Sequence, residues 1–82
     1  MRYTVEWEPT ARAELANLWV SAIDRQAITD AADRIDRRLM YSPETAGAEY
    51  GDDRWLRDDP LAVLFTVFPN ARLVKVLHVW IW

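Results

Sequence analysis

The sequence predicts an α+β fold of the order β-α-α-β-β-β, in which a two-helix hairpin packs on a twisted, mainly antiparallel sheet. Three observations lead to this prediction. Residues 2–8 alternate polar and apolar side chains at the period of a strand. Residues 10–41 hold two stretches whose apolar residues recur at helical spacing. Residues 54–82 hold three strand-like segments separated by turn residues, a pattern typical of a meander.

The length and composition favour one small globular domain. The chain has 82 residues, so we expect a single domain over residues 1–82. A hydrophobic fraction of 51% argues against a disordered chain. There is no cysteine, hence no disulfide framework and no cysteine-ligated metal. The sequence shows neither a signal-peptide-like start nor the ~18 consecutive apolar residues of a membrane span, so a cytoplasmic protein is expected.

The N-terminal half is predicted to form a strand and two helices. Tyr3, Val5 and Trp7 fall on one face of the strand, and Pro9 ends it. The first helix, over residues 10–23, has an apolar face made of Ala11, Leu15, Leu18, Trp19 and Ala22. The second helix, over residues 25–41, repeats this spacing with Ile28, Ala31, Ala32, Ile35 and Leu39.

Local signals set the bounds of the second helix and the character of its surface. Asp24 can cap its start, and Ser42-Pro43 ends it. The pairs Asp30–Arg34 and Asp33–Arg37 have the i,i+4 spacing of helical ion pairs. We therefore interpret the acidic residues of this helix as a solvated, salt-bridged surface and not as paired carboxylates for catalysis.

The C-terminal half is predicted to be a loop followed by three strands. Residues 44–53 contain both glycines and are expected to form the loop. Strands follow at 54–57, 61–68 and 72–82, and the continuous apolar run of residues 61–68 favours a central position. The first strand of the chain is expected to join the edge of this sheet beside a later strand.

The last strand is predicted to divide into two faces by strict alternation. The mostly aliphatic face should point to the helices and contains Leu73, Lys75, Leu77, Val79 and Ile81. The other face contains Arg72, Val74, Val76, His78, Trp80 and Trp82.

Charge and ligand patterns exclude several classes of function. The net charge is −3, whereas a general nucleic-acid binder usually has a basic surface. No His and Glu occur at the spacing of a metal-binding helix. We expect no metal and no cofactor.

The order of segments resembles a known family of small proteins. The resemblance is carried by YTVEWEPTARAELANLW, AADRIDRRLMYSP, RWLRDDPLAVLFTV and VKVLHVW, which together cover nearly the whole chain. These segments resemble the RelE/ParE superfamily of type II toxin–antitoxin toxins, the plasmid stabilisation proteins. The resemblance implies a cognate antitoxin partner that wraps around the toxin. It also implies one of two actions, cleavage of mRNA in the ribosome (RelE-like) or inhibition of DNA gyrase (ParE-like).

The same resemblance implies where an mRNA endonuclease of this family would carry its basic groups. The two expected lysines fall on Asp53 and Trp55, and the central-strand arginine falls on Ala62. A further arginine falls near Trp82, and the tyrosine falls beyond the chain end. None of these basic groups is matched. The sequence therefore favours a ParE-like toxin, or one of reduced toxicity, over an RNase.

An endonuclease with a rearranged site remains the alternative. Its candidate catalytic residues are Arg54, Arg57, Arg72 and His78, because Arg binds phosphate and His exchanges protons near neutral pH. A structural interpretation competes for each of them. Arg54 and Arg57 point to opposite faces of a strand and either can pair with a nearby Asp, and His78 can belong to a covered aromatic patch.

The tryptophans suggest a partner surface. Five Trp in 82 residues exceed what one small core easily hides, and large exposed apolar patches usually mark binding sites. We take Trp80, Trp82 and Lys75 as candidate partner-binding residues, with the sheet edge ending at Trp82 as a template for strand addition by an antitoxin tail. A non-toxic homodimer formed through the Trp-rich face is the remaining interpretation.

Overall fold

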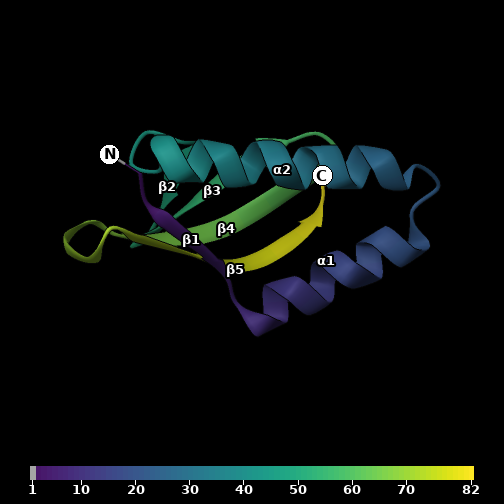
Figure 1. The fold of residues 1–82 in the computed structure, drawn as a ribbon, viewed down its shortest axis with the longest axis horizontal. Helices are drawn as coiled ribbons and strands as arrows, with labels where there is room; N and C mark the ends of the chain where they lie inside the picture. The colour runs from purple at the N-terminus through teal and green to yellow at the C-terminus, as the bar shows by residue number, and fades with distance from the viewer. Residues whose placement is uncertain (1) are drawn as a thin grey trace.

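The computed structural model describes residues 2–82 and has the predicted two helices on one side of a sheet (Figure 1). The elements in chain order are β1 (Thr4–Trp7), α1 (Pro9–Ser21), α2 (Arg25–Tyr41), β2 (Ala48–Tyr50), β3 (Asp53–Asp58), β4 (Leu61–Phe68), a 3-10 turn (Pro69–Ala71) and β5 (Leu73–Ile81). No helix in residues 2–82 combines the length and apolar character needed to cross a membrane.

The sheet has five strands in the order β1-β5-β4-β3-β2. β1 joins the edge beside β5, as expected, and this pair is parallel, whereas the other three pairs are antiparallel. The fold class predicted from the sequence is therefore confirmed.

One strand was missed. Residues 48–50 lie in the segment predicted to be a loop, yet they form β2, which pairs with β3. The strand is short and all three residues are exposed, so it lacks the apolar alternation by which a strand is recognised. Gly51 has a φ of 62° at the hairpin turn between β2 and β3, a conformation that favours glycine.

The two helices differ in how well they are buried. Asp24 caps α2 by accepting a hydrogen bond from the Ala27 backbone N–H at 3.1 Å. The inner face of α2 is fully buried and consists of Ile28, Ala31, Ile35 and Leu39. In contrast, Ala11 is the one fully buried residue of α1, and Trp19 is exposed. The apolar stripe of α1 is thus only partly covered by the rest of the chain.

The predicted ion pairs along α2 are not formed. Arg34 donates to both carboxylate oxygens of Asp58, at the end of β3, and to the carbonyl of Asp59. Asp30 accepts instead from Gln26. The long side chain of Arg34 reaches the carboxylate of Asp58 across the helix–sheet contact. This ion pair, which uses both carboxylate oxygens, replaces the predicted pair with Asp30.

A β-bulge overturns the predicted alternation of β5. Leu64 pairs with His78 whereas the next residue, Phe65, pairs with Val76, so Leu77 is an extra residue in β5. Val74 and Val76 are fully buried in the core before the bulge, and Val79 is buried after it. The prediction that Val74 and Val76 share the outer face with Trp80 was therefore wrong, because one inserted residue reverses the alternation beyond it.

Candidate functional site

The five tryptophans lie on two separate surfaces. The fully buried core of residues 2–82 contains none of them. Trp55, Trp80 and Trp82 lie on the sheet face opposite the helices, and Trp7 and Trp19 lie between α1 and α2. Each surface surrounds a cavity, and both are candidates for binding.

We call the first surface the aromatic face, and it consists of Tyr50, Trp55, Leu64, Trp80 and Trp82. These side chains line a cavity of about 350 Å³. The rings of Trp55 and Trp82 are stacked, with centroids 5.1 Å apart. Trp80 and Trp82 remain 36% and 53% exposed, so much of their apolar surface is available to a partner.

The structure separates the four candidate catalytic residues. Arg57 lies at the aromatic face, where its guanidinium sits 4.8 Å from the Trp82 ring centroid and its Nε donates to Asp59 at 2.9 Å. Arg54 points to the opposite face, as its spacing from Arg57 predicts. Its guanidinium donates to the carbonyls of Ala46 and Gly47, and its side chain is only 19% exposed. Arg54 therefore secures the loop before β2.

Arg72 and His78 lie elsewhere, the first immediately before β5 and the second within it. Arg72 precedes the strand, and its guanidinium lies 5.6 Å from the ring centroid of Tyr3. The Nδ1 of His78 lies 3.3 Å from a carboxylate oxygen of Glu14 on α1. Because Arg54, Arg72 and His78 each contact a different element, the four candidates do not form one site.

Lys75 is also apart from the two tryptophans with which it was grouped. Its Nζ lies 3.7 Å from Glu8 and 5.8 Å from the ring centroid of Phe68. In the β4–β5 ladder Lys75 pairs with Thr66, whereas Trp80 pairs with Ala62 several residues further along.

The edge of β5 is already occupied over part of its length. β1 pairs with residues 73–76, and beyond them Glu14 of α1 accepts a hydrogen bond from the Val79 N–H at 3.2 Å. The expectation that this edge is an open template for strand addition therefore does not hold at Val79.

The positions assigned to nuclease groups by resemblance have other roles here. Asp53 accepts a hydrogen bond from Thr66, and Ala62 is fully buried. Trp55 and Trp82 form the stacked pair. At these positions the sheet presents acidic, aromatic or small apolar side chains in place of basic groups. Within residues 2–82 no three His, Asp or Glu side chains are grouped so that they could share a metal ion.

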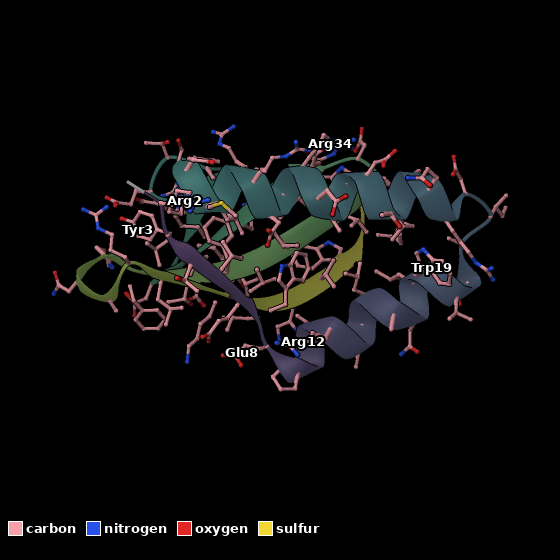
Figure 2. The ribbon with its side chains drawn as sticks, viewed as in Figure 1. Arg2, Tyr3, Glu8, Arg12, Trp19 and Arg34 are labelled. Atoms are coloured by element: carbon pink, nitrogen blue, oxygen red, sulfur yellow. The ribbon has the colours of Figure 1, made fainter. Side chains whose placement is uncertain are left out.

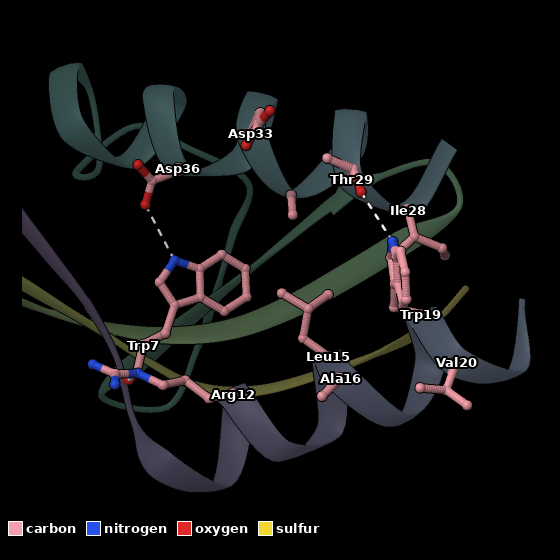
Figure 3. A pocket seen from close by; sticks show the side chains of 11 residues that line it. Trp7, Arg12, Leu15, Ala16, Trp19, Val20, Ile28, Thr29, Asp33 and Asp36 are labelled. Atoms are coloured by element: carbon pink, nitrogen blue, oxygen red, sulfur yellow. Dashed lines mark hydrogen bonds between the residues drawn. The ribbon is translucent and has the colours of Figure 1, made fainter. Parts of the chain in front are cut away.

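We call the second surface the helix groove, and Figure 3 shows it between α1 and α2. Its cavity of about 670 Å³ is lined by Trp7, Arg12, Leu15, Ala16, Trp19, Val20, Ile28, Thr29, Ala32, Asp33 and Asp36. Figure 2 places Arg12 near the start of α1 and Trp19 near its end. The groove thus follows most of the length of α1.

Two indole hydrogen bonds cross the helix groove. The Nε1 of Trp7 donates to Asp36 at 3.1 Å, and the Nε1 of Trp19 donates to the hydroxyl of Thr29 at 3.2 Å. Sequence reasoning assigned both tryptophans to apolar inner faces and did not identify this groove. The available signal was the indole N–H itself, which requires an acceptor when the ring is partly buried.

Comparison with known proteins gives the fold. No family model matches the sequence, and no curated protein is similar enough to match. The structure resembles the RelBE2 toxin–antitoxin complex from Mycobacterium tuberculosis, with a TM-score of 0.83 and 17% identity over 100% of this chain and 93% of that chain. It resembles the chromosomal ParDE system from P. aeruginosa, with a TM-score of 0.76 and 19% identity over 96% and 95% of the two chains.

A third similar structure is a mutant of the E. coli toxin RelE in the free state. Its TM-score is 0.70 and its identity 18%, over 96% of this chain and 82% of that chain. The similar structures thus include toxins of both the RelE and the ParE kind. The chain has the fold of the RelE/ParE toxins.

Proposed function

We propose that this protein is the toxin component of a type II toxin–antitoxin system and that it acts by binding its target, without cleaving RNA. The aromatic face is the observation that supports this proposal. Metal-free RNA cleavage needs a base, an acid and cations around the phosphate. The positions at which the family resemblance puts basic groups hold Asp53, Trp55, Ala62 and Trp82.

The target is a protein such as DNA gyrase, as for ParE-like toxins, and the place of action is the cytoplasm. Exposed Trp side chains beside an Arg are the residue types that dominate binding energy in protein interfaces. Trp80, Trp82 and Arg57 provide this combination.

The second partner is a cognate antitoxin. Two of the similar structures, RelBE2 and ParDE, are described as toxin–antitoxin systems, which supports this part of the proposal. We assign the antitoxin contact to Trp80 and Trp82, and also to Lys75 near the start of β5. An antitoxin that covers these residues would compete directly with the target.

The test is growth of a bacterial host under tight, inducible expression of the chain, with and without the adjacent open reading frame. We expect arrest that the neighbouring gene relieves. Trp80→Ala with Trp82→Ala should abolish arrest, while Tyr41→Ala, which removes an exposed aromatic residue outside both surfaces, should not. Unaffected growth at confirmed soluble expression of the unaltered chain would contradict toxicity.

An mRNA endonuclease with a rearranged site is the second candidate, and one contact favours it. His78 and Glu14 form a partly exposed imidazole–carboxylate pair, an arrangement able to transfer protons. If this candidate is correct, transcripts are cleaved on induction and His78→Ala abolishes cleavage without loss of folding. DNA-damage reporters respond instead if the target is gyrase.

A further inference from the structure

The cavity of the aromatic face has walls made of aromatic rings. Its lining residues come from neighbouring strands of the sheet: Tyr50 ends β2, Trp55 lies in β3, Leu64 in β4, Trp80 in β5, and Trp82 follows β5 directly. Leu64 stands opposite Trp55 in the β3–β4 ladder, so one aliphatic side chain lies among the four aromatic ones. The cavity therefore presents π systems from several strands to whatever enters it.

One cation already lies on this face. The Arg57 guanidinium is 4.8 Å from the ring centroid of Trp82, a distance at which the negative face of an indole attracts positive charge. The Nε of Arg57 also donates to Asp59 at 2.9 Å, and this ion pair balances its charge. Arg57 is not among the residues that line the cavity. A second cation inside the cavity would therefore not meet an unbalanced positive charge beside it.

The charges around the cavity favour a positive ligand over a phosphate. None of the five lining residues has a charged side chain. Tyr50 stands opposite Asp53 in the β2–β3 ladder, and Asp53 accepts a hydrogen bond from Thr66, so a carboxylate is held beside Tyr50. The whole chain has a net charge of −3. A phosphate would meet no basic side chain among the lining residues, whereas a cation is attracted both by the rings and by the acidic surroundings.

The polarity of the lining selects the kind of cation. Primary ammonium and guanidinium groups have N–H donors that need acceptors when they leave water. Among the five lining residues, the Tyr50 hydroxyl is the one side-chain oxygen. A trimethylammonium group has no N–H donor, and its methyl groups can pack on the rings that attract its charge. The cavity volume of about 350 Å³ is near the lower end of the roughly 300–1,000 Å³ of small-molecule sites, which suits a compact ligand.

We propose that the aromatic face binds a small organic cation with a trimethylammonium group, of which choline is the simplest probe. The ligand is a free small molecule, because the cavity is large enough to take such a molecule whole. This inference does not depend on the proposed toxicity, since binding is measured on the purified chain. A bound cation would share Trp80 and Trp82 with the proposed protein partners, so the cation and those partners would exclude one another.

The test is titration of the purified chain with choline, observed by NMR. Methyl protons that lie over an aromatic ring shift upfield through its ring current. We expect a saturable upfield shift of the choline methyl signal. The indole N–H signals of Trp55, Trp80 and Trp82 should change during the titration, whereas those of Trp7 and Trp19 in the helix groove should not.

The matched ligand control is the neutral isostere of choline, in which carbon replaces the nitrogen. It has the shape of choline without the charge, and we expect it to bind about fivefold more weakly because it gains no cation–π attraction. Equal affinity for the two compounds would show a general apolar cavity and would overturn the proposal.

Substitutions separate the contribution of the rings from that of apolar burial. Trp80→Leu keeps apolar bulk but removes an aromatic wall, so it should weaken choline about fivefold and change the affinity for the isostere less than about twofold. Trp80→Phe should restore most of the lost affinity. Tyr50→Leu should weaken choline, whereas Tyr41→Leu, which alters a comparably exposed tyrosine outside the cavity, should not.

Other ligands distinguish this site from two different ones. If adenosine monophosphate binds the aromatic face more tightly than choline, the face is a stacking surface for nucleobases and the proposal is wrong. If a trimethyllysine peptide binds more tightly than choline, the ligand is a protein and not a free small molecule. A choline signal that shows no saturable shift would rule out the site altogether.

Discussion

Tryptophan carries a single polar N–H group on a large apolar ring. Two tryptophans, Trp7 and Trp19, line the helix groove. Trp7 and Trp19 obey the apolar spacing of their elements, and the sequence therefore predicted them as core residues. Their position follows from the indole N–H, which finds its acceptor on α2. A binary pattern of polar and apolar residues cannot represent a side chain that is both.

A double-mutant cycle measures the bridge between Trp7 and Asp36. Trp7→Phe keeps a ring but loses the N–H, and Asp36→Ala removes the acceptor. Because both groups are only half-buried, we expect a coupling free energy of about 1 kcal/mol from denaturant unfolding of the four proteins. Purely additive effects would show that the hydrogen bond does not hold the groove.

The two glycines should differ in their response to substitution. Both have positive φ, at 64° for Gly47 and 62° for Gly51. A Cβ on Gly47 would lie 1.9 Å from the Trp55 carbonyl oxygen, whereas one on Gly51 meets no atom within 4 Å. Gly51→Ala should cost roughly 1 kcal/mol of unfolding free energy for its backbone conformation alone. Gly47→Ala should cost clearly more, and equal costs would contradict the close approach.

Tyr3 gives a stability term that depends on pH. Its hydroxyl donates to Glu44, and this hydrogen bond, burial and the Glu44 charge raise the pKa of Tyr3 above 10.0, although Arg72 lowers it. The folded protein thus holds the phenol proton more tightly than the unfolded chain. The contribution is complete below about pH 10 and is lost as the pH rises through the raised pKa.

The Tyr3→Phe variant lacks the titrating hydroxyl and therefore lacks this pH-dependent contribution to folding stability. The variant should lose less stability than the unaltered protein between about pH 8 and about pH 11, by chemical denaturation at each pH. Parallel curves for the two proteins would show that Tyr3 titrates alike in the folded and unfolded states.

At the scale of elements, similar sequence patterns produced unequal packing. Both helices were predicted from the same spacing, yet α2 buries a continuous stripe and α1 buries one residue completely. Which helix crosses the middle of the sheet depends on topology, which periodicity does not encode. The same holds for β5, where each half alternates as predicted but the bulge joins the halves out of phase.

This difference should be visible in backbone dynamics. Elements with few buried contacts open at lower free energy than the core. We expect the amides of α1 to exchange with solvent faster than those of α2 in native-state hydrogen exchange. Equal protection of the two helices would mean that α1 is held by contacts that its burial does not reveal.

At the scale of the whole molecule, the fold was predictable because every segment favours the same architecture. The sites were less predictable because they depend on which side chains the fold brings together. Arg54 and Arg57 differ by only three positions. One secures a loop and the other lies on a tryptophan. Strand alternation predicts that they lie on opposite faces, but no local pattern predicts which of them meets the loop and which meets the tryptophan.

The oligomeric state is a further prediction at this scale. A standard interface takes about 800 Å² from each partner and about 20–30 residues a side. The aromatic face has five residues on a molecule with 5205 Å² of accessible surface. We therefore expect a monomer in sedimentation over a concentration series. A dimer that Trp80→Ala dissociates would instead support a homodimer built on this face.

The parallel pairing of β1 with β5 has a consequence for how the protein is made. Thr4 pairs with Leu73, so β1 can join the sheet only after residue 73 has been synthesised. β5 is also flanked by β1 and β4, and it supplies Val74, Val76 and Val79 to the core. The first 72 residues must therefore be synthesised before the sheet can be completed. Trp80 and Trp82 of the aromatic face lie beyond this pairing, so that surface also forms only after most of the described residues have been made.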